Sequence, residues 1–190
     1  MRSLIITAFI FLQAALLRAS DTTRPSKDYF HFSAGYWEGG NRKDAGSIYG
    51  SFGYAKFIQD PLAIGLSAEF LSYRGARPWL GDQIMVPLSF EVRKQNLSTD
   101  KTSFMALVQA GWAIYNNKFS EGPIHITEKG GFASGIGAGA QFKSKGHVAF
   151  YMHLKMRVVV IKTSNDVLGP VRHDSQSINM LQIGAGLRVR

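Results

Sequence analysis

Two acidic residues, Glu69 and Glu91, stand in segments whose other residues are mostly apolar or small. A pair of carboxylates can act as general acid and general base when one of them keeps its proton near neutral pH. Four basic residues occupy comparable positions: Arg93, Lys155, Arg157 and Arg188. Because nearby cations keep carboxylates ionised, the pattern favours a structural network of ion pairs over acid catalysis.

Other residue types with chemical potential are scattered. The chain has no Cys, which excludes thiolate metal sites, disulfides and a cysteine nucleophile. Its five His are dispersed without metal-ligand spacing, although His147 and His173 each lie near a Ser, which keeps a lipid-modifying enzyme as an alternative. Gly135-x-Gly-x-Gly lacks the following helix of a dinucleotide-binding loop. We therefore expect no catalytic residue, no cofactor, no metal site and no enzyme activity.

Hydropathy alternates with a period of two through most of the chain, which is typical of β-strands with two unlike faces. Each segment has about the length that a tilted membrane-crossing strand needs, and none shows a convincing helical period. The alternation predicts an all-β fold, an eight-stranded antiparallel up-and-down transmembrane barrel. The eight expected strands are residues 29–37, 48–57, 62–73, 84–93, 104–114, 132–142, 148–158 and 178–190.

The two faces of these strands differ in composition. One face is continuously apolar, whereas the other holds small, polar and charged residues. We expect the apolar face to point outward to lipid, because the polar face is rich in Gly and Ser and poor in the Lys and Glu of a soluble surface. The residues expected inside are Glu69, Glu91, Arg93, Gln109, Gln141, His153, Lys155, Arg157 and Arg188. In so narrow a barrel they should form an ion-pair network that fills the lumen, with room left by Gly135, Gly137 and Gly139.

The connections alternate in length. Those after residues 57, 93 and 142 are short or compact, whereas residues 39–47, 74–82, 116–131 and 162–177 are expected to be longer loops. This alternation is typical of short periplasmic turns and longer extracellular loops, which places both termini in the periplasm. Two aromatic girdles are expected, one at the turn end and one at the loop end. Their residues are Phe30, Phe57, Phe90, Phe104, Phe142 and Phe150 at the turns, and Tyr36, Trp37, Tyr73, Trp79, Trp112 and Tyr115 at the loops.

Residues 1–20 have the layout of a secretory signal peptide, with Arg2, an apolar stretch and small residues at Ala19 and Ser20. The alternative is an uncleaved anchor helix. Residues 21–190 would then form the barrel domain. The formal net charge is +9, yet the long loops are nearly neutral, so no nucleic-acid partner is expected.

The Gly-rich alternating segments 132–140 (FASGIGAGA) and 181–188 (LQIGAGLR) carry a family resemblance. The mature chain resembles the small eight-stranded outer-membrane barrels of OmpA/OmpX-type architecture. It is most similar to the porin-like outer membrane beta-barrel families common in Bacteroidetes. The resemblance implies a Gram-negative cell envelope and an integral outer-membrane location. One departure is the C-terminal Val189-Arg190, where such barrels usually end in an aromatic residue.

We expect a structural or surface-interaction role through the extracellular loops, with the lipid bilayer and an extracellular protein or ligand as partners. Two alternatives remain: a narrow anion-preferring pore, because bases outnumber acids in the lumen, and a soluble secreted barrel that binds an apolar ligand. The candidate loop contacts are the apolar residues Phe119, Ile124, Ile126, Val167 and Val171.

Overall fold

The computed structural model describes residues 27–39, 46–74, 82–96, 102–121, 124–142, 147–167 and 172–190. The expected signal peptide, residues 1–20, lies outside these ranges. In the described part of the chain, no helix is long and apolar enough to cross a membrane.

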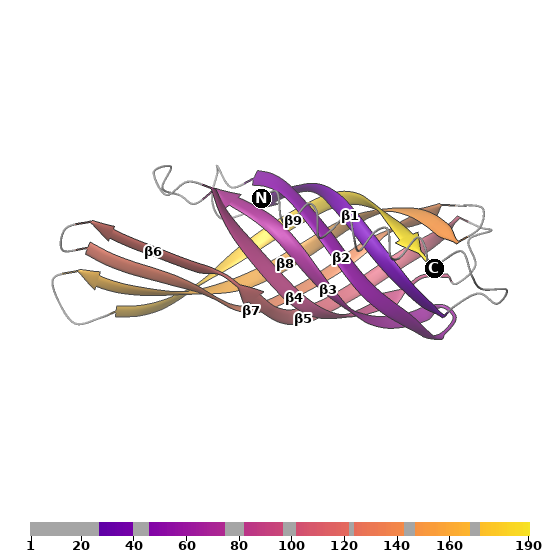
Figure 1. Cartoon of the computed structure of the whole chain (residues 1–190), viewed down its shortest axis with the longest axis horizontal. Coiled ribbons are helices and arrows are strands. Elements are labelled where there is room, and N and C mark those ends of the chain that lie inside the picture. The colour runs from indigo at the N-terminus through magenta and orange to yellow at the C-terminus, as the bar shows by residue number, and fades with distance from the viewer. Residues whose placement is uncertain are drawn as a thin grey trace.

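The described residues form nine consecutive β-strands, which make one antiparallel sheet (Figure 1). They are β1 (Asp28–Gly39), β2 (Gly46–Gln59), β3 (Leu62–Arg74), β4 (Asp82–Lys94), β5 (Ser103–Ile114), β6 (Asn116–Glu121), β7 (Ile124–Phe142), β8 (Val148–Val167) and β9 (Arg172–Val189). Only Tyr115 separates β5 from β6, and both pair with β7, so they make one wall strand. β1 pairs with both β2 and β9, which closes the sheet. The structure confirms an eight-stranded antiparallel barrel.

The period-two pattern of each strand places its apolar residues on the outside of the barrel. On β8, Met152, Leu154 and Met156 are each at least half exposed, whereas the alternating His153 and Lys155 are buried. The same division holds around the wall, with Leu66, Val108, Ile136 and Ile183 among the outward residues. The soluble alternative required the continuously apolar face of the strands to point inward, and it is wrong because that face points outward.

Glycine allows close approach of side chains at two inward positions. A Cβ at Gly53 would lie 2.3 Å from Nε2 of His31, and one at Gly184 would lie 2.0 Å from the hydroxyl oxygen of Tyr49. Both distances are far below van der Waals contact. These glycines therefore make room for the inward rings of neighbouring strands.

Two segments expected to be loops are largely strand. Residues 116–131 hold β6 and the start of β7, and residues 162–177 hold the end of β8 and the start of β9. The two hairpins also pair with each other, from Ile124↔Val167 to Lys129↔Lys162. We call this four-stranded extension, residues 116–121, 124–130, 160–167 and 172–177, the wing. It projects beyond the barrel at the left of Figure 1.

The aromatic girdles need a correction. Trp37, Phe57 and Tyr115 are buried inside the barrel, because they share the parity of the inward residues of their strands. Tyr36, Trp112, Phe90, Phe104, Phe142 and Phe150 point outward as expected. The side chains of Tyr73 and Trp79 lie outside the described part of the structure.

Candidate functional site: the barrel interior

The interior is stacked in three layers along the barrel. At the wing end lies an apolar layer, which the sequence patterns did not predict. At the turn end lies a smaller apolar layer, and the charged residues lie between the two. The wing-end layer contains Trp37, Tyr49, Leu71, Met85, Ala113, Tyr115, Ala133, Val159, Ile161 and Met180, and the turn-end layer contains Tyr29, Ala55, Phe57 and Ala63.

Glu69 on β3 is the centre of one charged cluster. Its Oε1 forms ion pairs with Lys155 and with Arg157, whose Nη2 lies at 2.8 Å. Its Oε2 accepts a hydrogen bond from Nε2 of Gln182 at 3.3 Å. Lys155 and Arg157 stand two residues apart on β8, so the strand period points both cations at the same carboxylate.

Glu91 on β4 is the centre of the second cluster. Nε of Arg93 lies 2.8 Å from Oε1 of Glu91, and Nε2 of His31 lies 2.7 Å from the same oxygen. Arg93 also donates from Nη2 to Nδ1 of His31 at 3.0 Å. Because a guanidinium can only donate, Nδ1 must accept, and the neutral imidazole then carries its proton on Nε2, the nitrogen that lies near Oε1 of Glu91.

Gln109 on β5 joins the two clusters. Its Nε2 donates to Oε2 of Glu91 at 3.1 Å and to Oγ of Ser67 at 3.0 Å, and its Oε1 accepts from Nη2 of Arg157 at 2.6 Å. An amide serves this position because it presents a donor to one side and an acceptor to the other. The sequence placed Gln109 inside the barrel without revealing this bridging role.

The charged layer touches both apolar layers. Towards the wing end, the Tyr49 hydroxyl shares a hydrogen bond of 2.7 Å with Nε2 of His153. Towards the turn end, the guanidinium of Arg188 lies 5.7 Å from the ring centroids of Tyr29 and Phe57. Arg188 also donates from Nη1 to the Asn96 carbonyl at 2.7 Å. Gln141, the remaining residue expected inside, is buried.

This arrangement suits structure better than catalysis. Each glutamate contacts at least one arginine, an environment that holds it ionised. Among the described residues, no three His, Asp or Glu gather where they could hold a metal ion. His147 and His173 lie at opposite ends of the barrel, at the turn before β8 and on the wing.

The candidate loop contacts fall on the wing. Ile126 is half-buried on β7. Phe119, Ile124 and Val167 belong to β6, β7 and β8, but their side chains lie outside the described part of the structure, as does the whole of Val171.

Comparison with known proteins identifies the fold. No protein-family model and no curated protein matches the chain. The crystal structure of Neisserial surface protein A (NspA) is similar, with a TM-score of 0.58, 12% sequence identity, and coverage of 86% of this chain and 97% of that one. Outer membrane protein AlkL, solved by solid-state NMR in DMPC lipid bilayers, matches with a TM-score of 0.56, 12% identity, and coverage of 90% and 94%.

The chain therefore has the fold of the small outer-membrane barrels. The comparisons give no support to the narrower resemblance to families of Bacteroidetes.

Removing the Glu69 carboxylate tests the energetics of the charged layer. Glu69→Gln leaves Lys155 and Arg157 buried beside a neutral amide, which should lower the free energy of unfolding by about 3–5 kcal/mol. Urea unfolding in detergent micelles measures this loss. In the double variant Glu69→Gln/Lys155→Met the loss should be smaller than the sum of the single losses. Additive losses would contradict a direct interaction between Glu69 and Lys155.

Proposed function

We propose that the chain is an integral outer-membrane β-barrel with a closed interior that presents the wing to the cell exterior. The belt of exposed apolar side chains carries this proposal. On β8 the outward residues are apolar from Phe150 to Val160, a rise of about 33 Å at roughly 3.3 Å per residue. A strand tilt of about 40° reduces this to about 25 Å, the height of the apolar band of outer-membrane barrels.

The layered interior supports a closed lumen. An eight-stranded barrel is just wide enough to be filled by its own side chains. In this barrel, two apolar layers and one layer of paired charges fill the lumen. A charged layer alone could rearrange around a passing ion, whereas the apolar layers offer such an ion few polar contacts.

The arrangement of the two rims supports an orientation. The start of β1, the end of β9 and the β2–β3 turn all lie at the end of the barrel opposite the wing. Short connections face the periplasm in barrels of this class, and the longer ones face outward. Both ends of the barrel domain are then periplasmic, and the wing stands outside the cell as its contact surface.

Charge substitution at two depths tests whether the belt lies in a bilayer. Leu154 and Ile58 are both outward and at least half exposed, but Leu154 lies in the middle of the belt and Ile58 beside the β2–β3 turn. In lipid vesicles, Leu154→Arg should cost about 2–4 kcal/mol and Ile58→Arg only about 0–1 kcal/mol, as measured by urea unfolding. Equal costs would contradict a membrane-spanning belt.

Planar-bilayer recordings distinguish the closed barrel from the anion-preferring pore. The refolded protein should show no conductance steps. Leu71→Ala/Met85→Ala and Glu69→Ala/Lys155→Ala should each stay silent, because each leaves another layer in place. A variant that combines both sets with Tyr29→Ala/Phe57→Ala, and so opens the turn-end layer as well, should conduct, whereas the outward control Leu66→Ala/Leu88→Ala should not. Steps from the unmodified protein would overturn the closed lumen in favour of the pore.

Shortening the wing tests the surface role. Residues 118–127 and 163–174 can each be replaced by Asn-Gly, which joins residues that are direct register partners. The shortened protein should keep its barrel, seen as heat-modifiable migration on a gel. Cells that display it should lose adhesion to protein-coated surfaces and to one another. Unchanged adhesion would remove the surface role and leave the barrel intact.

A further inference from the structure

The outward face of the wing, which continues the apolar belt of the barrel, is basic. Register pairing aligns its residues in two rows across β6, β7, β8 and β9. No acidic residue occurs in either row. The row nearer the belt is Asn116, Lys129, Lys162 and Ser175, and the next row is Lys118, Thr127, Ser164 and His173.

The carboxylates of this part of the wing belong to the other face. Glu128 and Asp174 both align with Thr163, in the row between the two basic ones. Oε2 of Glu128 accepts a hydrogen bond from the Tyr115 hydroxyl at 3.0 Å, and Tyr115 lies inside the barrel. In these three rows the β-strand alternation therefore places the lysines on the belt side and Glu128 and Asp174 in the row of the other face, whereas Asp166 occupies a belt-side position further out, opposite His125.

Lys129 and Lys162 are direct register partners. Like charges placed directly opposite each other across two strands destabilise the pair unless an anion lies between or beside them. Within the described residues, neither lysine makes an ion pair with a carboxylate. The pair is thus a site of positive potential that no carboxylate in the described part of the chain compensates with an ion pair.

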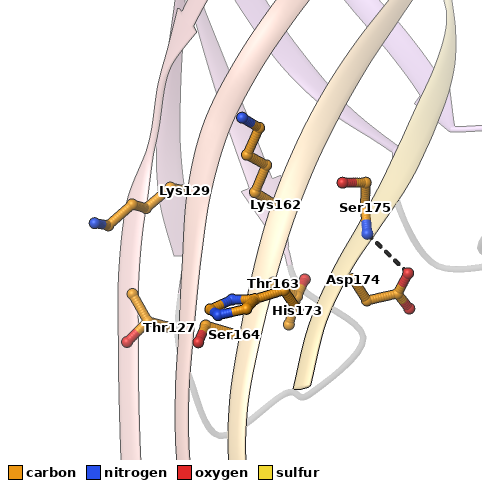
Figure 2. A pocket seen from close by; sticks show the side chains of 8 residues that line it. All are labelled: Thr127, Lys129, Lys162, Thr163, Ser164, His173, Asp174 and Ser175. Atoms are coloured by element: carbon orange, nitrogen blue, oxygen red, sulfur yellow. Dashed lines mark hydrogen bonds between the residues drawn. The ribbon is translucent and has the colours of Figure 1, made fainter. Parts of the chain in front are cut away.

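A hollow of about 460 Å³ lies against these lysines and is edged by hydroxyl groups. In Figure 2, Lys129 and Lys162 lie above Thr127, Ser164 and His173, with the Lys129 ammonium pointing to the left and the Lys162 ammonium pointing upward. The hydroxyl and imidazole groups of these residues line the same hollow as the two lysines. Asp174 borders the hollow on β9, away from Lys129, and its Oδ1 accepts a hydrogen bond from the Ser175 amide at 2.7 Å. Ammonium and hydroxyl donors together are the groups that bind phosphate oxygens.

The height of the hollow favours a lipid phosphate over a free one. On β8, Val158 is the last outward apolar residue with substantial exposure, and Lys162 stands four positions further on. That is about 13 Å along the strand, and less along the membrane normal because the strand is tilted. Lysines just beyond the apolar band lie at the level of lipid headgroups, where their stems can lie on apolar surface while the ammonium reaches phosphate.

We propose that the Lys129–Lys162 pair, with the hydroxyls of Thr127, Ser164 and Ser175, binds the phosphate of an outer-leaflet lipid headgroup. The site anchors the base of the wing to the membrane surface. This inference rests on the proposed membrane-spanning orientation. It assigns a ligand class, a lipid phosphate, to the outward face of the wing, which would otherwise contact only solvent.

Native mass spectrometry of the refolded full chain in detergent, titrated with diphosphoryl lipid A, tests the site. The unmodified protein should retain lipid A. The double variant Lys129→Gln/Lys162→Gln should bind it about thirtyfold more weakly, because each of the two lysines near an anionic lipid surface contributes on the order of 1 kcal/mol. Fully dephosphorylated lipid A should not be retained, and inorganic phosphate should compete weakly.

A charge-matched control separates the site from general attraction. Lys56→Gln/Lys94→Gln removes two exposed lysines from the turn end, and it should leave lipid A retention unchanged. Equal weakening by both double variants, or undiminished binding by the Lys129→Gln/Lys162→Gln protein, would overturn the proposal. Strong competition by inorganic phosphate would indicate a free-anion site instead.

Heat-modifiable migration and the Leu154→Arg result report on membrane spanning separately, so failure of the lipid site is distinguishable from failure of the barrel orientation.

Discussion

The main physical constraint on this fold is the burial of charged side chains in the narrow lumen of a closed barrel. Two glutamates and their basic partners lie in a lumen where each charge would be costly without a partner. The wall supplies those partners from opposite sides, since Glu69 on β3 contacts Arg157 on β8. Closing the sheet and satisfying the charges are thus a single requirement. A wall that slipped by one residue would turn Glu69, Lys155 and Arg157 outward, and the apolar belt inward.

Strand number, face assignment and the inward set of polar residues could all be predicted from the sequence, because a period of two is a local property. The pairing of individual side chains could not. Tyr49 and His153 share a hydrogen bond across 104 residues, and their meeting depends on the register of every strand between them. The bridging role of Gln109 is hidden for the same reason, because it contacts Glu91 on β4 and Arg157 on β8 at once.

The features that the sequence did not predict, the wing and the wing-end layer, were hidden for physical reasons. The wing was expected to be loop because neither of its faces is apolar, so the hydropathy signal for a strand disappears while backbone pairing continues. The wing-end apolar layer was not predicted because Trp37, Leu71 and Met85 stand among outward apolar neighbours and do not interrupt an apolar run. In Trp37 the polar part of the ring is satisfied inside the barrel, where Nε1 donates to the Ser72 carbonyl at 3.1 Å.

The break at Tyr115 has a consequence for how neighbouring molecules meet. On the turn-end side of Tyr115, the wall is closed and each strand has a partner on both sides. On the wing side of Tyr115, β6 is a sheet edge that pairs with β7 and with no other strand in the described part of the chain. An open edge invites strand addition from a second molecule. The edge here is only six residues long and carries Lys118, and both features discourage such addition. The other edge of the wing is the start of β9, where residues 172–179 pair with β8 alone in the described part of the chain. The exposed Asp174 on that edge likewise disfavours the joining of neighbouring wings into one continuous sheet.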